Sequence, residues 1–460
     1  MTITPNRQWA LIAGPLLAIA VAVGMDQSGW EAQACWTGAV AILCVIWWIF
    51  EPIPIPATAI IPLAVFPLTD VLPQEKIAAA YGSELILLML GGFILSAAME
   101  RSGAHRRIAL GMVNVIGGTS SRRIVLGFMV ATAALSMWIS NTATVLMMLP
   151  IALAVITQSP DKKLALPLLL AIAYGSSIGG LGTPIGTPPN LVFMQQYESF
   201  TGTAVSFSQW MGWGLPVVVI FLPLAGLWLT RKLDYRGELV IPPAGDWRPE
   251  ERRVLIIFGL TALAWVTRLE PFGGWSTWMG LKGANDAIVA LVAVVILFLV
   301  PNGRGGKLID WQTAERVPWG ILILFAAGIA IAQAFVESGL SRAIADQLAV
   351  LASLHPLVMI ATIALIVTFL TETTSNTATT ILLMPILASA ALGAGIDPAL
   401  LMVPAAMSAS CAFMLPVATA PNAIVFGSGH VTVANMVREG LTLNLIGVLV
   451  ITLVCYFWVA

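Results

Sequence analysis

A five-residue phrase of small polar side chains occurs twice in a chain that is otherwise strongly apolar. Residues 140–144 read Ser-Asn-Thr-Ala-Thr, and residues 375–379 repeat the same five residues. Hydroxyl and amide oxygens are suitable ligands for a hard cation. Backbone amides left free at the start of a helix attract an anion. Each copy of the phrase could therefore contribute to a cation site and to an anion site.

The residues around the two copies also match. A hydroxyl side chain, Ser136 or Thr371, lies four residues before each phrase. Farther along, residues 184–190 (Pro-Ile-Gly-Thr-Pro-Pro-Asn) parallel residues 416–422 (Pro-Val-Ala-Thr-Ala-Pro-Asn), where Gly186 and Ala418 are small enough for close backbone approach. We expect the Pro-Asn pair in each segment to break a helix and start its second part. The chain thus contains an internal duplication.

The elements that position these residues must be membrane helices. Of 460 residues, 58% are hydrophobic and only 10% are charged, which is more apolar surface than a soluble core could bury. The apolar runs are long and continuous rather than alternating, which favours helices over a β-barrel. The fold class predicted is therefore an all-α polytopic membrane protein.

Two stretches do not fit a simple series of spans. Residues 124–157 and 353–391 are each apolar, too long for one crossing of about 20 residues, and interrupted midway by the repeated phrase. A helical hairpin that enters and leaves on one side explains both, because irregular backbone at membrane depth must be satisfied by protein or by a water-filled cavity. We predict eleven transmembrane helices plus two re-entrant helical hairpins.

The distribution of basic residues orients this topology. With a cytoplasmic N-terminus, 18 of the 22 basic residues fall on the cytoplasmic side, and the C-terminus is periplasmic or extracellular. The first hairpin then enters from inside and the second from outside, with a polar linker at residues 231–253 between the halves. Inverted-topology repeats with broken helices are typical of secondary transporters.

Charged residues are scarce in the two segments that carry the phrase. Residues 124–230 contain Asp161, Lys162, Lys163 and Glu198, and residues 351–437 contain Glu372 and Asp397. No intramembrane Arg or Lys can pair an anionic substrate, so bound cations and helix dipoles must offset its charge. Cation coupling is the expected consequence.

Glu372 breaks the symmetry, because its counterpart in the first copy is Met137. An ionisable residue at membrane depth is a candidate proton carrier. At the end of a hairpin, however, it could simply face water. The sequence leaves both alternatives open.

These motifs resemble the divalent anion:sodium symporter family, which includes the INDY-type proteins and bacterial dicarboxylate transporters, and the resemblance covers essentially the whole chain. It implies sodium as the coupling ion and a dicarboxylate bound between the two phrases. The implied sodium ligands are Ser136, Ser140, Asn141 and Gly186 in the first site and Thr371, Ser375, Asn376 and Ala418 in the second. The implied substrate contacts are Asn141, Thr142, Thr187 and Pro188, with Asn376, Thr377, Thr419 and Ala420. Ala420 departs from the family pattern, in which proline is expected at this position. The departure bears on which substrate shape the protein prefers.

The resemblance also implies how the protein works. A scaffold (residues 1–120 and 245–350) would hold a transport part (121–244 and 351–460) that moves as an elevator, in a homodimer within the lipid bilayer of the bacterial inner (plasma) membrane. The expected activity is sodium-coupled import of C4-dicarboxylates such as succinate, malate and fumarate. No nucleic-acid partner is expected.

Three other functions compete with sodium-coupled dicarboxylate symport. A sodium-independent exchanger of di- or tricarboxylates would share the fold, but the small polar residues kept at both cation sites favour symport. A sodium/proton antiporter could use Glu372, but the sequence lacks an intramembrane acidic pair. An enzyme is disfavoured because no His-Glu-x-x-His or Gly-x-Ser-x-Gly motif occurs.

Overall fold

The computed structural model describes residues 5–117, 120–237, 245–269, 273–281, 283–348 and 355–459. Within these ranges the chain is helical, apart from turns, loops and two isolated backbone bridges, which confirms the all-α prediction. Some parts of the sequence prediction fall in or beside the gaps, outside the described residues. They are Pro242 and Pro243 of the linker, the basic residue Lys282, and the domain boundaries at 244/245 and 350/351.

Helices of the first half precede the linker. They are α1 (Pro5–Gln27), α2 (Ala32–Phe50), α3 (Ile55–Thr58), α4 (Ile60–Leu68), α5 (Gln74–Tyr81), α6 (Glu84–Ser102), α7 (Ala104–Ile116), α8 (Ser121–Ser136), α9 (Asn141–Gln158), α10 (Ala165–Gly180), α11 (Pro188–Thr201) and α12 (Phe207–Thr230).

The second half follows the linker. It contains α13 (Pro249–Val266), α14 (Gly274–Trp278), α15 (Asp286–Leu299), α16 (Trp311–Ala314), α17 (Trp319–Glu337), α18 (Leu340–Leu348), α19 (Pro356–Leu370), α20 (Asn376–Gly393), α21 (Ala399–Ala409), α22 (Ala420–Gly427) and α23 (Val433–Trp458).

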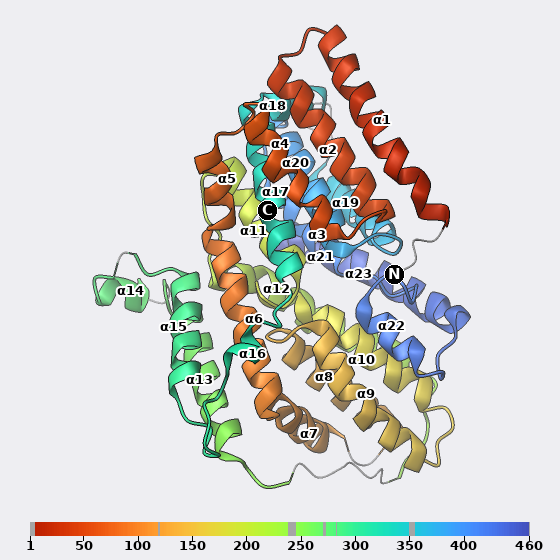
Figure 1. Ribbon diagram of the computed structural model, residues 1–460. Helices are drawn as coiled ribbons and strands as arrows, with labels where there is room; N and C mark the ends of the chain where they lie inside the picture. The colour runs from red at the N-terminus through yellow and green to blue at the C-terminus, as the bar shows by residue number, and fades with distance from the viewer. Residues whose placement is uncertain are drawn as a thin grey trace.

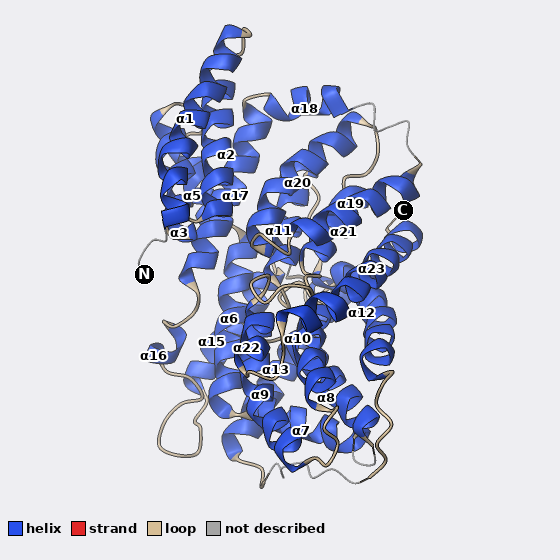
Figure 2. Ribbon diagram, turned by 90° about the vertical axis from the view of Figure 1, so that its right-hand side faces the viewer, coloured by secondary structure: helices blue, strands red, loops and turns tan. Residues whose placement is uncertain are grey.

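The duplication is visible in the order of the helices. The series α6 to α12 corresponds element by element to the series α17 to α23: a long apolar helix, a short amphipathic one, a helix pair, a broken helix and a final long helix. Figure 2 shows α8 and α9 in the lower half of the molecule and α19 and α20 in the upper half, with loop segments between them. The two helix pairs thus lie toward opposite ends, as inverted repeats require.

Eight helices in the described part of the chain are long and apolar enough to cross a membrane, and five shorter apolar helices accompany them. Two of the eight, α9 and α20, begin at the second residue of each repeated phrase. The protein is therefore a polytopic helical membrane protein. The division into eleven crossings and two re-entrant hairpins stays a prediction.

The two halves interlock through their broken helices. In the first half α11 packs against α20 and α21 of the second half, while α22 packs against α9 and α10 of the first. Figure 1 shows the blue α22 beside the yellow and tan α10 and α9. The repeated phrases and the breaks in α10–α11 and α21–α22 consequently meet at the centre of the molecule.

Candidate functional site

Each copy of the repeated phrase lies where two helices meet. The first tip, residues 136–141, contains the turn between α8 and α9, and the second tip, residues 371–376, contains the turn between α19 and α20. Ser140 is the N-cap of α9, where its hydroxyl accepts a hydrogen bond from the amide of Ala143 at 3.2 Å. This is the usual way in which serine satisfies a free amide at a helix start. Asn141 and Asn376 are the first residues of α9 and α20.

The two tips contain the same internal hydrogen bond. In the first tip the Ser136 hydroxyl donates to Oδ1 of Asn141 at 2.5 Å. In the second the Thr371 hydroxyl lies 2.7 Å from Oδ1 of Asn376 and 2.8 Å from the carbonyl oxygen of Ala409. Ser136 and Thr371 are fully buried. Each tip therefore presents a buried cluster of hydroxyl and amide oxygens, the donor set that suits an alkali cation.

A buried asparagine holds each break in place. The Asn190 amide donates to the carbonyl oxygens of Gly180 (2.9 Å) and Thr183 (2.8 Å), across the first unwound segment, residues 181–187. The Asn422 amide donates in the same way across the second unwound segment, residues 410–419, to Ala412 and Leu415, both at 3.0 Å. The helices resume at Pro188 and Ala420, two residues earlier than these asparagines. Each Asn therefore bridges back over the break.

A cavity of about 1230 Å³ separates the two tips. All eight predicted substrate-contacting residues line it, together with Ser140, Gly186, Ser375 and Ala418 from the predicted sodium sites. Ser136 and Thr371 lie behind the cavity wall. The fold thus brings the sequence-predicted residues of both halves around one space, and their roles as ligands stay predictions.

Four helices begin at the wall of this cavity. Asn141, Pro188, Asn376 and Ala420, the first residues of α9, α11, α20 and α22, all line it. A helix start carries about half a positive elementary charge. Four such starts around one space make an environment that favours an anion with two negative charges, without a basic side chain at the tips.

The rim of the cavity holds its charged residues. They are Glu51, Glu100, Arg101 and Arg316. Arg101 forms an ion pair with Asp310 at 2.5 Å. A hydrogen bond from the Thr313 hydroxyl, and to a lesser extent one from Arg101, lowers the pKa of Asp310 to about 2. Asp310 is therefore ionised, and able to pair with Arg101, at pH values well above 2.

Glu372 does not face water. It is 3% exposed, and its carboxylate accepts hydrogen bonds from the backbone amides of Phe413 (2.7 Å), Met414 (2.9 Å) and Leu415 (3.0 Å) and from the side chain of Asn444 (2.8 Å). The water-facing alternative is therefore wrong, because the side chain is enclosed by the second unwound segment and α23.

Two participants were missed by sequence reasoning. Ser410 lies 3.4 Å, oxygen to oxygen, from Thr187, which makes it a direct polar contact between the halves. Asn444 supports Glu372 from α23. Their counterparts in the first half, Ile178 and Val218, are apolar, so the duplication contains no signal for them.

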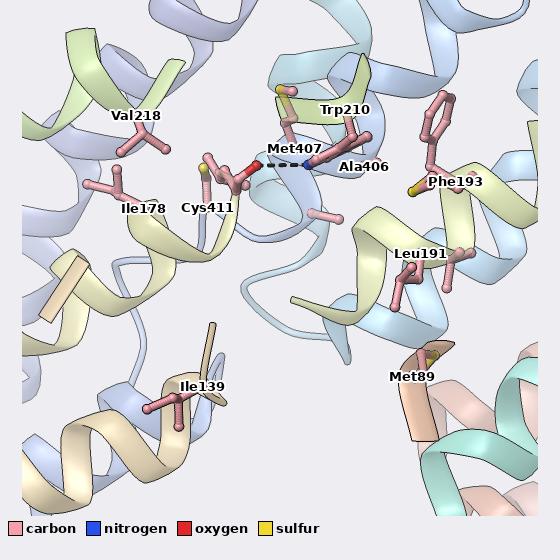
Figure 3. Close-up of a cluster of buried hydrophobic side chains, with 14 of the residues drawn as sticks. Met89, Ile139, Ile178, Leu191, Phe193, Trp210, Val218, Ala406, Met407 and Cys411 are labelled. Atoms are coloured by element: carbon pink, nitrogen blue, oxygen red, sulfur yellow. Dashed lines mark hydrogen bonds between the residues drawn. The ribbon is translucent and has the colours of Figure 1, made fainter. Parts of the chain in front are cut away.

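Apolar packing surrounds the polar centre. Figure 3 shows side chains of α10, α11, α12 and α21 gathered around the breaks, with the indole of Trp210 donating to the carbonyl oxygen of Leu181 at 3.0 Å. That bond satisfies a carbonyl at the start of the first unwound segment. The non-helical backbone is thereby enclosed by protein, as membrane depth requires.

Comparisons with known proteins agree with this architecture. Residues 45–402 match the family described as citrate transporter. The chain is 41% identical to the sodium-dependent dicarboxylate transporter SdcS of Staphylococcus saprophyticus over 98% of this chain and 91% of that protein. It is 40% identical to SdcS of Staphylococcus aureus strain USA300 over 97% and 90%.

A solved structure shares the fold. The Alcanivorax borkumensis YdaH transporter, whose crystal structure is described as revealing an unusual topology, aligns with a TM-score of 0.61 at 15% identity, over 86% of this chain and 88% of that one. The family and these relatives are transporters and not enzymes. On the repeated motifs, the shared architecture and identity over nearly its whole length, the chain belongs to the divalent anion:sodium symporter family.

Proposed function

We propose that the protein is a secondary active transporter that imports C4-dicarboxylates such as succinate, malate and fumarate by sodium-coupled symport. One observation carries the proposal: two tips with the same hydroxyl-to-asparagine bond face a single cavity at which four helices begin. The relatives named sodium-dependent dicarboxylate transporters support the same substrate and ion.

Sodium would bind behind each tip. Ser136, Ser140, Asn141 and Gly186 would supply oxygens for the first ion, and Thr371, Ser375, Asn376 and Ala418 for the second. The hydroxyl-to-Oδ1 bond in each tip supports this proposal, because it brings two of these oxygens together, those of Ser136 and Asn141 in the first tip and of Thr371 and Asn376 in the second. To bind a cation, the hydroxyl in each tip would turn its proton away and coordinate through a lone pair, and the two oxygens would move apart to admit the ion.

The dicarboxylate would lie across the cavity, with one carboxylate near each tip. Each carboxylate would meet two helix starts and the hydroxyls of two threonines, Thr142 and Thr187 on one side and Thr377 and Thr419 on the other. Burying an uncompensated anion costs several kcal/mol. Sodium at both tips offsets that cost, so we propose that sodium binds first and completes the anion site.

The larger motion follows from the repeats. We propose that residues 121–244 and 351–460 move as an elevator against a scaffold of residues 1–120 and 245–350, within a homodimer in the bacterial plasma membrane. With the proposed cytoplasmic N-terminus and outward-facing C-terminus, the cavity rim at Arg101 and Arg316 would lie on the cytoplasmic side. The structure would then represent the inward-facing state.

Uptake of labelled succinate into proteoliposomes tests the proposal. We expect accumulation with an inward sodium gradient and none when potassium replaces sodium on both sides. Unlabelled malate and fumarate should compete, whereas citrate and sulfate in the same panel define the limits of the site. Sodium-independent uptake, or counterflow in the absence of sodium, would overturn the symport proposal in favour of exchange.

A further inference from the structure

Glu372 connects the second tip to the second unwound segment through three backbone amides. The amides of Phe413 and Met414 donate to its Oε1 and that of Leu415 to its Oε2. Asn444 adds a fourth hydrogen bond from α23. Hydrogen bonds to an ionised acceptor are roughly twice as strong as neutral ones. A single side chain therefore joins α19, the break in α21–α22, and α23.

The first half satisfies the equivalent amides differently. Leu181 and Gly182, the counterparts of Phe413 and Met414, donate to the carbonyl oxygens of Ile178 (3.2 Å) and Gly179 (2.9 Å) at the end of α10. The helix there runs to Gly180, whereas α21 already ends at Ala409. The second half thus leaves its helix earlier, and Glu372 supplies the acceptors that helix carbonyls supply in the first.

The side chains at equivalent positions agree with this difference. Met137 stands in place of Glu372, and its side chain packs against Gly182, where an added Cβ would lie 3.0 to 3.2 Å from it. Val218 stands in place of Asn444 and faces Ile178 (Figure 3). Where the second half has a carboxylate with its partners, the first half has apolar contacts.

The neighbour of Glu372 belongs to the proposed second cation site. Thr371 contacts Asn376 and the carbonyl oxygen of Ala409, the last residue of α21. Glu372 itself does not line the cavity, although Thr373 and Thr374 do. It can therefore act on a cation only through the backbone it holds and through its charge, which in a low-dielectric surrounding favours a nearby cation.

We propose that Glu372 is a positioning residue that holds the second tip and the second unwound segment in their cation-binding arrangement, so that the sodium affinity of the second half depends on it. The proposal deepens the proposed function and rests on it. The first half has Met137 in place of Glu372, so the proposed first cation site would form without such a support.

The test compares Glu372→Gln with the matched variant Met137→Gln in the other tip. Gln keeps the length of the Glu372 side chain but replaces one acceptor oxygen with a donor and removes the charge. We expect the sodium concentration for half-maximal succinate uptake to rise on the order of tenfold in Glu372→Gln. The maximal rate at saturating sodium should change much less. Glu372→Asp should recover part of the affinity, and Met137→Gln should leave sodium dependence within about twofold of the original.

A second measurement separates this proposal from the transport activity. The sodium-dependent rise in melting temperature of the purified protein should need more sodium in Glu372→Gln than in the original chain. If the original chain shows no sodium-dependent uptake, the proposed function fails. If the original transports normally and Glu372→Gln has unchanged sodium dependence in both assays, the role of Glu372 is refuted.

Should Glu372→Gln not fold, Asn444→Ala replaces it. This variant removes one hydrogen bond to the carboxylate and should shift the sodium dependence in the same direction by about threefold. An unchanged sodium dependence in a well-folded Asn444→Ala protein would count against the proposal, and a shift confined to the maximal rate would do so as well.

Discussion

The two halves of the site share their ligand-bearing residues but differ in how their broken helices are supported. The first break follows a helix that continues to Gly180 and closes its own turns, and the second follows a helix that ends at Ala409 and depends on Glu372. The polar side chains of the tips and the asparagines that bridge the breaks are duplicated, whereas the Glu372 support is not. Two nearly identical motifs can therefore differ in rigidity and in cation affinity.

The asparagines at the two tips offer the strongest test of their equivalence. We expect Asn141→Ala and Asn376→Ala each to reduce sodium-driven succinate uptake by about a hundredfold or more, because each removes an oxygen shared by the proposed cation site and the substrate site. Uptake rates per mole of purified protein in proteoliposomes give the measurement. Asn435→Ala, at the start of α23 and away from the cavity, serves as the control. Normal transport by both tip variants would remove the two-tip arrangement.

Substitution of the asparagines that bridge the breaks should destabilise the protein by different amounts in the two halves. Asn190→Ala removes the side-chain donor to the carbonyl oxygens of Gly180 and Thr183, of which the Thr183 oxygen still accepts from the amide of Gly186. We expect this loss to cost about 2 to 4 kcal/mol. Asn422→Ala loses the same bonds but keeps the Glu372 support, so its cost should be smaller. Melting temperatures of the purified variants in one detergent measure the difference. Equal losses would show that Glu372 does not reinforce the second break.

Removal of the buried hydroxyls in the tips should change the sodium dependence of uptake by a smaller factor, and by different amounts in the two halves. The Thr371 hydroxyl has two acceptors within reach, Oδ1 of Asn376 and the carbonyl oxygen of Ala409, and can donate its one proton to either, whereas the Ser136 hydroxyl donates to Asn141. We therefore expect Thr371→Val to raise the sodium concentration for half-maximal uptake by about tenfold and Ser136→Ala by about fivefold. Thr371→Ser retains the hydroxyl and should behave like the original chain. A larger effect at Ser136 would reverse the order of the two sites.

Substitution of Ala420 should have the smallest effect on transport. Proline has no backbone N–H, so Pro188 cannot donate at the start of α11, whereas Ala420 can donate at the start of α22. Ala420→Pro would make the halves more alike. We expect the KM for succinate to rise about threefold with sodium dependence unchanged. An unaltered KM for succinate and malate would indicate that this amide does not contact substrate.

Much of the fold was predictable because its signals are local or repeated. Continuous apolar runs identified membrane helices, and the interruptions at Ser140 and Ser375 located the turns between helix pairs. The sequence predicts helix breaks at Asn190 and Asn422. It does not predict the hydrogen bonds from their side chains to carbonyl oxygens of the preceding residues, because these depend on where each helix ends. Ser410 and Asn444 were missed because no equivalent residue in the first half marks them.

The sequence by itself determined that this is a helical membrane protein built from a duplication, and which small polar residues stand at its two tips, because hydrophobicity and repetition can be read along one chain. Only the tertiary structure decided that α11 and α22 each pack on the opposite half, so that four helix starts surround one cavity. It also decided that Glu372 is buried against Phe413, Met414 and Leu415. Those contacts join residues about 40 positions apart, and a local pattern carries no record of them.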